Sequence, residues 1–327
     1  MKLHMDVIIE SFPVAGKFVI SRGSKTQANV VRVILQHGDF TGHGECVPYA
    51  RYGESVASVV AQIETMRAAF AAGMTRPDLQ TSMPAGAARN AIDCALWDIE
   101  AKVSGVPAFT SAGFANPVTV TTAYTLSMGT PDEMAAAAKL ASNRPLLKIK
   151  VGGVGDMERL RAVASSAPNS RIIVDANEGW TADNIVENMA LAASLGVVLI
   201  EQPLPAGQDQ ILAAIAHPVA ICADESVHEA KDLAALADRY DAVNIKLDKS
   251  GGLTEALKMH GIARQSGLKI MIGCMVGTSL AMAPALILAQ NADFVDLDGP
   301  LLLARDREPG LIYQGSIVFA PGAALWG

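Results

Sequence analysis

The stretches LLKIKV (residues 146–151) and RIIVDAN (171–177) show the pattern that decides the fold. Each is a short run of β-branched and other apolar residues that ends in polar side chains, and an Ala- and Leu-rich segment of helical character follows it. The pattern repeats from about Thr119 onward. Its eight runs are TTAYTLS (121–127), LLKIKV, RIIVDAN, VVLIEQP (197–203), VAICADES (219–226), AVNIKLDK (242–249), KIMIGCM (269–275) and DFVDLDGP (293–300).

This alternation predicts a parallel sheet, because units of strand, helix and strand form right-handed crossovers. Eight units with no interrupting domain favour an α/β fold, a modified TIM barrel of the (β/α)7β type, over residues 116–309. An open doubly wound sheet is the alternative, although no GxGxxG motif follows the first strand.

The first 115 residues follow a different pattern. Strand-like NVVRVILQ (29–36) precedes two helical stretches, SVASVVAQIETMRAAF (55–70) and GAARNAIDCALWDIEAKV (86–103). We therefore expect an α+β capping domain over residues 1–115.

Two segments of this region are rich in glycine and polar residues: VISRGSKTQ (19–27) and GHGECVPYARYGE (42–54). Such composition predicts loops, and we expect them to cover a site. The strand-like segment 310–327 is expected to pack back on the capping domain.

The composition excludes several classes of protein. Of the 327 residues, 50% are hydrophobic and 18% charged, which predicts a large buried core. A net charge of −7 without a basic run argues against nucleic-acid binding. The 4 cysteines show no CxxC spacing, which suits free thiols in a reducing compartment, and Asp6 and Glu10 interrupt any signal peptide. A cytoplasmic protein is expected, and homo-oligomerisation is left open.

Residues 270–289, IMIGCMVGTSLAMAPALILA, carry no charge and are long enough to span a bilayer. Gly273, Gly277 and Pro284 interrupt the segment, and no aromatic residue or one-sided Lys/Arg excess flanks it. A buried strand, a polar loop and a core helix are the better prediction, so no membrane association is expected.

Lys148 and Lys150 lie in an otherwise apolar strand. Alternate residues of a strand share a face, so both side chains should enter the barrel near its carboxyl end. Two ammonium groups at this range disfavour each other's charge, which predicts that one lysine is a neutral base near pH 7.

The next three strands end in the carboxylates Asp175, Glu201 and Asp224. They are 26 residues (201 minus 175) and 23 residues (224 minus 201) apart, about one strand–helix unit each. Three acids at one barrel end, with no His or Cys beside them, predict a site for Mg²⁺, with Mn²⁺ as an alternative.

Lys246 occupies the same relative place on the sixth strand, so it should face the second-strand lysines across the barrel mouth. Two opposed bases suit removal of a proton from one face of a carbon and its return to the other, with a metal stabilising the enolate between these steps. A single Asp at a strand end is more often a helix cap than a metal ligand, and a single lysine in a barrel interior is usually part of an ion pair. Five such groups on successive strands, however, predict catalysis. Asn177, Glu225 and Asp248 are candidates for orienting them.

The motifs KIK, VDAN, IEQP, ADES and NIKLDKSGG together resemble the muconate-lactonizing subgroup of the enolase superfamily, over essentially the whole chain. The resemblance implies that Lys150 and Lys246 are the acid/base pair and that Lys148 tunes Lys150. It also implies that Asp175, Glu201 and Asp224 bind Mg²⁺, one ion per subunit.

The last strand, DFVDLDGP, places Asp296 and Asp298 on one face, where two more carboxylates require a cationic partner such as a substrate ammonium. This D-x-D is similar to the one that holds the free α-amine in dipeptide epimerases. GECVPYARYGES (44–55) and PAGAARNAIDCALWD (84–98) likewise resemble the L-Ala-D/L-Glu epimerases of murein peptide recycling. The resemblance implies epimerisation of Ala-Glu through a metal-stabilised enediolate.

The resemblance also implies further contacts with the dipeptide substrate. Arg22 matches an arginine that meets the glutamate carboxylates, and Thr125 matches a substrate-contacting threonine. Cys274, Met275 and Val276 match a segment that lines the pocket, although Cys274 is equally suited to plain packing.

Other activities stay open at this point. Within the superfamily they are other dipeptide specificities, cycloisomerisation and o-succinylbenzoate synthesis, whose substrates lack the amine that Asp296 and Asp298 would bind. A Schiff-base aldolase using Lys150 or Lys246 belongs to another chemistry. A barrel that only binds peptides belongs to another class.

Overall fold

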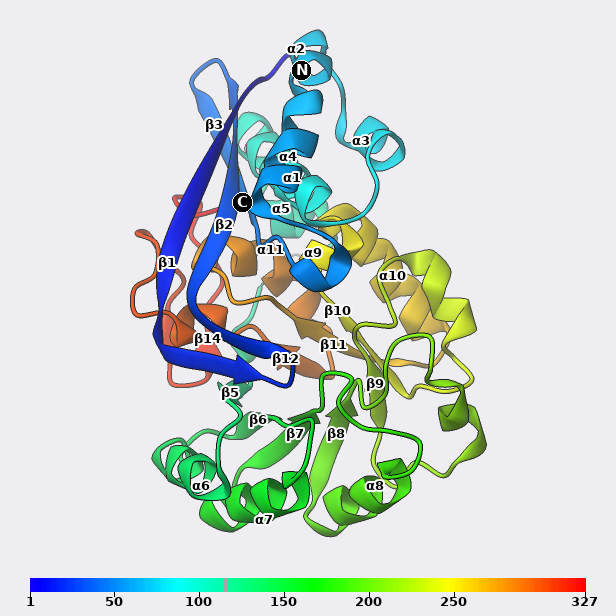
Figure 1. Cartoon of the computed structure of the whole chain (residues 1–327). Helices are drawn as coiled ribbons and strands as arrows, with labels where there is room; N and C mark the ends of the chain where they lie inside the picture. The colour runs from blue at the N-terminus through cyan, green and yellow to red at the C-terminus, as the bar shows by residue number, and fades with distance from the viewer. Residues whose placement is uncertain (115–116) are drawn as a thin grey trace.

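A barrel of parallel strands carries an antiparallel sheet and several helices above one end (Figure 1). The computed structural model describes residues 1–114 and 117–327. The expected boundary between residues 115 and 116 therefore lies outside the described residues, and the domain limits stay a prediction.

The barrel contains eight strands, and each neighbouring pair in its sheet is parallel. The first and last strands of this sheet meet through a hydrogen bond from Ala123 N to Val295 O (2.8 Å). The predicted α/β near-barrel is thus confirmed. Its strands are β5 (Tyr124–Leu126), β6 (Leu146–Lys150), β7 (Arg171–Asp175), β8 (Val197–Glu201), β9 (Ile221–Ala223), β10 (Ala242–Ile245), β11 (Lys269–Gly273) and β12 (Phe294–Asp296).

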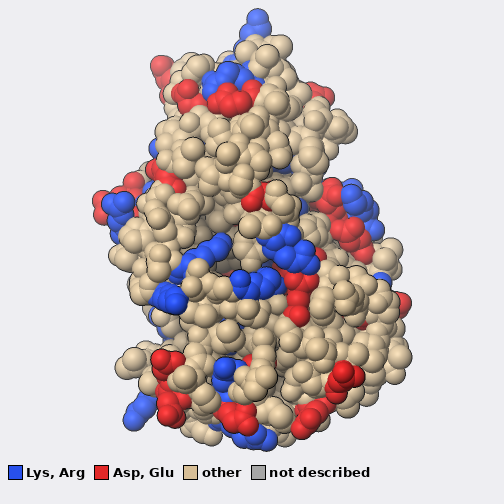
Figure 2. Space-filling model, in the orientation of Figure 1, with Lys and Arg blue, Asp and Glu red and all other residues tan. Residues whose placement is uncertain are grey.

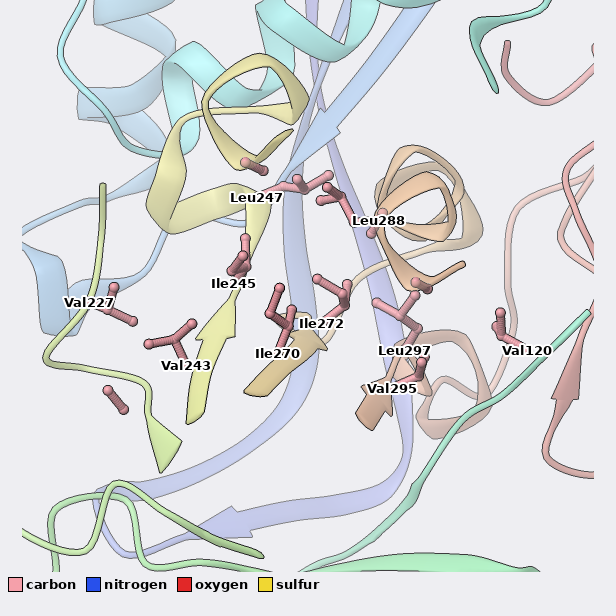
Figure 3. Close-up of a cluster of buried hydrophobic side chains, with 14 of the residues drawn as sticks. Val120, Val227, Val243, Ile245, Leu247, Ile270, Ile272, Leu288, Val295 and Leu297 are labelled. Carbon is pink, nitrogen blue, oxygen red and sulfur yellow. The ribbon is translucent and has the colours of Figure 1, made fainter. Parts of the chain in front are cut away.

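The barrel strands are buried on both faces. Side chains of one parity, such as Val243, Ile245 and Ile272, pack outward beneath the helices (Figure 3). Side chains of the other parity, such as Ile173 and Leu199, fill the interior. The polar strand-end residues stand two positions further along the same interior face, so this apolar plug forms the floor of the site.

Five of the seven connections contain α-helices of 10 to 13 residues. The helical stretch expected after every strand is wrong for the other two, which carry short 3-10 helices. Before the first of these, Pro205 and Gly207 shorten the segment available to a helix. The connecting helices are α6 (Pro131–Leu140), α7 (Asp156–Ser166), α8 (Ile185–Ser194), η2 (Gln210–Ala214), η3 (Ala230–Ala235), α9 (Leu247–Ser250), α10 (Leu253–Gln265), α11 (Ser279–Ala289) and η4 (Gly299–Leu302), which follows β12.

The N-terminal cap combines a three-stranded antiparallel sheet with helices. Its second predicted helix forms as one long element, whereas the first breaks at Met66 into two. The elements are β1 (His4–Ile20), β2 (Gly23–His37), β3 (Phe40–Cys46), η1 (Ala50–Tyr52), α1 (Val56–Thr65), α2 (Arg67–Ala72), α3 (Arg76–Ser82), α4 (Ala87–Ser104) and α5 (Ala108–Ser111).

The loops predicted for residues 19–27 and 42–54 are partly wrong. The first is the tip of a long hairpin, in which only Ser21 and Arg22 lie between β1 and β2. The second segment begins inside β3. Its glycines are needed because the strand lies close against the backbone of α4. A Cβ at Gly44 would lie 2.1 Å from Ala91 O of α4, so the strand needs glycine there.

The C-terminal segment contacts both parts of the chain. Strands β13 (Tyr313–Gln314) and β14 (Ile317–Val318) form a small antiparallel sheet with β4 (Val120–Thr121). Trp326 Nε1 then donates to Cys94 O (2.9 Å), and the backbone NH of Gly327 donates to Asp98 (2.7 Å).

The apolar segment 270–289 forms β11, a loop and α11, as its glycines and proline predict. None of the described helices is both long and apolar enough to cross a bilayer.

Candidate active site

The predicted catalytic side chains lie together at the carboxyl end of the barrel. Lys150, Asp175 and Glu201 are the last residues of β6, β7 and β8 and stand in register with one another. Asp224 and Lys246 directly follow β9 and β10. All five are buried.

Ion pairs connect these groups across neighbouring strands. Lys150 Nζ lies 2.5 Å from Asp175 Oδ2. Lys148 Nζ lies 2.6 Å from Glu201 Oε2, 2.7 Å from Asp296 Oδ2 and 3.2 Å from Asp175 Oδ2. Lys148 and Lys150 thus share a face, as predicted, and meet at the same carboxylate.

Asp224 is held from the other side by two lysines. Lys246 Nζ lies 2.7 Å from its Oδ2, and Lys249 Nζ lies 2.6 Å from its Oδ1. Lys249 also donates to the carbonyl oxygens of Asp224 and Asn244. It reaches them because the single turn of α9 brings it back over the strand end, a role that the sequence analysis missed.

The carboxylates control the protonation of two lysines. Burial alone would lower the pKa of Lys148, but Asp296, Glu201 and Asp175 raise that pKa well above its ordinary value. Burial likewise opposes the charge of Lys246, and Asp224 with Glu201 raises its pKa. For Lys148, neighbouring carboxylates therefore outweigh the lysine–lysine repulsion on which the prediction of a neutral base rested.

The carboxylates themselves differ. Burial opposes the charges of Asp175 and Asp224, but the lysines around each hold its pKa below the ordinary value. Burial, followed by the charge of Asp175, raises the pKa of Glu201 to about 7. More positive charge at this point would therefore stabilise the ionised form of Glu201.

The residues fit a hard divalent cation. Asp175, Glu201 and Asp224 supply only oxygen donors, on three adjacent strands, and all are buried. Within residues 1–114 and 117–327, no three His, Cys, Asp or Glu side chains already converge on one metal-sized point. Lysines hold the carboxylate oxygens, so metal binding requires these oxygens to turn toward a common centre.

Lys150 and Lys246 occupy opposite sides of the barrel. Lys150 ends β6 and Lys246 follows β10. Around the barrel these two strands are separated by β7, β8 and β9 in one direction and by β5, β12 and β11 in the other. Both lysines line the same cavity of about 530 Å³, beside Asp224. A ligand in this cavity would therefore lie between the two amines.

A smaller recess continues inward from this cavity. Asp296, Asp298, Thr125 and Lys148 line it, and it shares Cys274, Met275 and Val276 with the larger cavity. The structure thus brings the predicted substrate-contacting residues to one continuous space.

The two aspartates of the recess are distinct. Asp296 pairs with Lys148, whereas Asp298 accepts a hydrogen bond from the backbone NH of Thr125 (2.6 Å). Burial, followed by the charge of Asp296, raises the pKa of Asp298 to about 7. Asp296 Oδ1 is buried and accepts no hydrogen bond from the described residues, so an additional donor in the recess would satisfy it.

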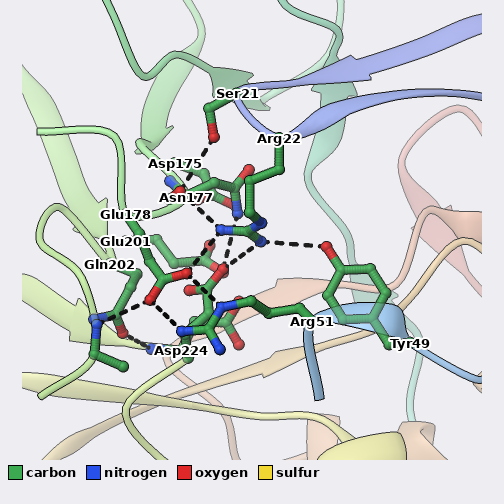
Figure 4. Close-up of polar contacts among 12 residues, drawn as sticks. Ser21, Arg22, Tyr49, Arg51, Asp175, Asn177, Glu178, Glu201, Gln202 and Asp224 are labelled. Carbon is green, nitrogen blue, oxygen red and sulfur yellow. Dashed lines mark hydrogen bonds and ion pairs between the residues drawn. The ribbon is translucent and has the colours of Figure 1, made fainter. Parts of the chain in front are cut away.

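Arg22 lies over the site, but its guanidinium is occupied by the protein (Figure 4). It donates to Glu225 Oε1 (2.6 Å), Glu178 Oε2 (3.1 Å), Asn177 O (2.8 Å) and Tyr49 OH (3.2 Å). These contacts tie the tip of the β1–β2 hairpin to the loop after β7 and to the start of the loop after β9.

Glu178 completes this link, which the sequence analysis missed. Arg51 of η1 forms two 2.8 Å hydrogen bonds to its carboxylate, and Arg22 forms a third. We call Arg22, Arg51 and Glu178 the clasp. Asn177 and Glu178 have φ angles of 44° and 67°, which turn the chain sharply after Asp175. Loop residues with such contacts carry no periodic signal in the sequence.

The three residues predicted to orient the catalytic groups make different contacts. The backbone NH of Asn177 donates to Asp175 Oδ1 (2.9 Å), and its side chain lies 3.4 Å from Glu225 Oε1. Asp248 instead accepts from Val47 N (3.0 Å) and Asn90 Nδ2 (2.8 Å), so it joins the barrel to the cap.

Comparison with known families agrees with this geometry. Residues 4–110 match the mandelate racemase / muconate lactonizing enzyme N-terminal domain, and residues 133–304 match the enolase C-terminal domain-like family. The chain belongs to the enolase superfamily. This membership confirms the family that the strand-end motifs predicted.

Two superfamily relatives are similar over nearly their whole length. The L-Ala-D/L-Glu epimerase of Escherichia coli (strain K12) is 48% identical over 93% of this chain and 96% of the relative. The N-acetyl-D-glutamate racemase of Pseudoalteromonas sp. is 44% identical over 91% of this chain and 95% of the relative. Both names describe inversion at a carbon centre.

Two solved structures of the superfamily contain ligands. An enolase family member from Agrobacterium tumefaciens with homology to dipeptide epimerases is 58% identical, with a TM-score of 0.99 over 99% of this chain and 100% of that chain. It holds sodium and L-Ala-L-Glu with an ordered loop. A dipeptide epimerase from Methylococcus capsulatus, complexed with Mg and L-Arg-D-Lys, is 30% identical, with a TM-score of 0.88 over 98% of each chain.

Proposed function

We propose that this chain is a Mg²⁺-dependent dipeptide epimerase that inverts the α-carbon of the C-terminal residue of Ala-Glu. The observation that carries the proposal is the placement of Lys150 and Lys246 on opposite sides of one cavity, with the diacid of Asp296 and Asp298 at its inner end. The names of the relatives from Escherichia coli and Agrobacterium tumefaciens support this substrate class.

The two lysines would exchange one proton each with the substrate. The first, unprotonated when it acts, takes the α-proton: the Cα–H bond breaks and its electron pair moves toward the carboxylate to give an enediolate. The second, protonated, delivers a proton to the opposite face, and a new Cα–H bond forms with inverted configuration. The roles reverse for the other epimer.

Asp175, Glu201 and Asp224 would hold the metal ion. Mg²⁺, or Mn²⁺ in its place, would supply positive charge that offsets the second negative charge that the substrate carboxylate gains when the α-proton leaves. Lys148, which pairs with Glu201 and Asp296, would link the metal ligands to the substrate's carboxylate and keep Lys150 correctly oriented.

Asp296 and Asp298 would bind the free α-amine of the dipeptide, and Thr125 would fix Asp298 through its backbone NH. Cys274, Met275 and Val276 would form the wall beside the substrate. A direct contact of Arg22 with the substrate carboxylates stays a prediction, because its guanidinium already has several acceptors.

The diacid also separates this function from its rivals. Cycloisomerisation and o-succinylbenzoate synthesis use substrates without an amine, which would leave two buried carboxylates facing a neutral or anionic group. Racemisation of N-acetylglutamate is a second candidate, supported by the Pseudoalteromonas relative. Such a substrate lacks the ammonium as well, so the diacid favours the dipeptide.

Proton NMR in deuterated water tests the proposal. With Mg²⁺, L-Ala-L-Glu should lose the Glu α-proton signal while signals of L-Ala-D-Glu appear, and EDTA should stop both changes until Mg²⁺ or Mn²⁺ is restored. Exchange of N-acetylglutamate alone would select the second candidate. Binding without exchange of any substrate would select a peptide-binding protein. A role in murein peptide recycling and a cytoplasmic location stay predictions.

A further inference from the structure

Lys25 belongs to the hairpin that covers the cavity. It lies directly opposite Phe18 in the β1–β2 register, so the two side chains share a face of the hairpin. The Phe18 ring lies 5.9 Å from Lys150 Nζ, which shows that this face is turned toward the catalytic lysine. Lys25 and Phe18 both line the cavity.

Lys25 is a cation without an acidic partner. No carboxylate of the described residues lies within 4.0 Å of its Nζ, and its ammonium donates no hydrogen bond to them. Its nearest polarisable neighbour is the Tyr49 ring, whose centroid is 4.9 Å away. Although the residue is accessible at the cavity mouth, the surrounding protein lowers its pKa by desolvation, a cost that an anionic ligand would relieve.

The other two cationic side chains that the cap contributes to the cavity are occupied. Arg22 is paired with Glu225 and Glu178, and Arg51 with Glu178. The face seen in Figure 2 is hollowed near its middle, and Lys and Arg side chains gather around the hollow although the chain carries a net charge of −7. Among the cationic cap residues that line the cavity, Lys25 is therefore the one whose charge is not already paired with a carboxylate of the described residues, so it can bind an anionic ligand.

We propose that Lys25 binds the side-chain carboxylate of the substrate's C-terminal residue and so sets the preference for an acidic residue there. This inference rests on the proposed function and deepens it. Bound by its amine at Asp296 and Asp298, with its reacting carbon between Lys150 and Lys246, a dipeptide would direct its second side chain outward. The outer part of the cavity is lined by this hairpin, including Lys25, and by residues 49–52.

The decisive experiment compares Lys25→Met with the wild-type chain on two dipeptides of equal shape, L-Ala-L-Glu and L-Ala-L-Gln, by α-proton exchange with Mg²⁺. Loss of one charge-assisted hydrogen bond should raise KM for the Glu dipeptide about tenfold or more. KM for the Gln dipeptide and kcat for both should change less than about twofold, because the variant loses only a weak contact between the ammonium and the Tyr49 ring among the described residues.

Two further variants sharpen the comparison. Lys25→Arg should restore most of the preference because it keeps the charge. Lys17→Met changes an exposed lysine of the same hairpin that does not line the cavity, and it should behave as wild type.

The outcomes separate the two proposals. If Lys25→Met leaves the Glu/Gln ratio unchanged, or raises KM equally for both dipeptides, the assignment of Lys25 is wrong while the epimerase stands. If the wild-type chain exchanges neither dipeptide, the proposed function fails and this inference fails with it.

Discussion

The strand ends of the barrel and the hairpin above them face the same cavity, but their polar groups are held differently. Lys148 is 1% exposed and contacts three carboxylates, whereas Arg51 of the cap is 39% exposed and contacts one. At the strand ends, each side chain is fixed by the β-ladder and by several charged neighbours. In the cap, the positions of Arg22 and Arg51, which are 26% and 39% exposed, depend on a few ion pairs.

This difference indicates that the strand ends and the cap have different roles. Proton transfer needs atoms placed to within a fraction of an ångström, which rigid strands provide. Recognition of a side chain and entry of the substrate tolerate, and require, a cover that can move. Substitutions at the strand ends should therefore abolish turnover, while those in the cap should adjust affinity and preference.

The largest effect is expected for the opposed lysines. Lys150→Ala or Lys246→Ala should lower epimerisation about 10³-fold or more, because each removes the amine that would exchange a proton with one face of the substrate's α-carbon. Each variant should still exchange the α-proton of one epimer, detected by NMR in deuterated water. Lys269→Ala, at the exposed opposite end of β11, is the control. Unchanged epimerisation in either catalytic variant would contradict the two-base assignment.

A smaller loss is expected at the inner recess. Asp296→Asn should raise KM for L-Ala-L-Glu about 10- to 100-fold, because it removes a buried carboxylate that would bind the substrate ammonium. N-acetyl-L-Ala-L-Glu, which has no ammonium, should bind weakly and equally to both proteins. Asp293→Asn, in the exposed pair with Arg264, is the matched control. Equal use of both dipeptides by the wild-type chain would remove the diacid from the mechanism.

The pH dependence of KM tests the same recess. Burial raises the pKa of Asp298 to about 7, so its carboxyl group is neutral below that value and anionic above it. KM for L-Ala-L-Glu should therefore fall as pH rises from about 6 to about 7.5, where most of the substrate amine, with a pKa of about 7.7–8.0, is still protonated. Asp298→Asn should flatten this part of the profile. A profile that is identical in the variant would assign the titration to another group.

The smallest effect is expected in the clasp. Arg51→Met removes two hydrogen bonds to Glu178, but Arg51 itself is 39% exposed, so kcat/KM should change by about two- to fivefold. Arg67→Met, which breaks the exposed pair with Glu64 on the far helices of the cap, should leave kcat/KM unchanged. A loss of 100-fold or more in Arg51→Met would mean that the cap is as strictly placed as the strand ends.

The sequence was sufficient for the strand-end residues because they follow a local rule. Lys150, Asp175 and Glu201 stand at equal positions in successive units, and parallel pairing brings equal positions to one level of the barrel. It was less informative about the cap. The glycine-rich stretch around Gly44 resembles a loop, yet it is a strand that lies against α4.

By itself, the sequence determined the barrel, its family and the buried charged residues at its mouth, because a two-residue strand period and a repeated unit length are properties of the chain. Only the tertiary structure decided that Arg22 is engaged by Glu225, that Lys249 reaches Asp224 and that Lys25 lies over the Tyr49 ring without a carboxylate partner among the described residues. These contacts join segments far apart in the chain. They depend on how the hairpin packs over the barrel, which no local pattern encodes.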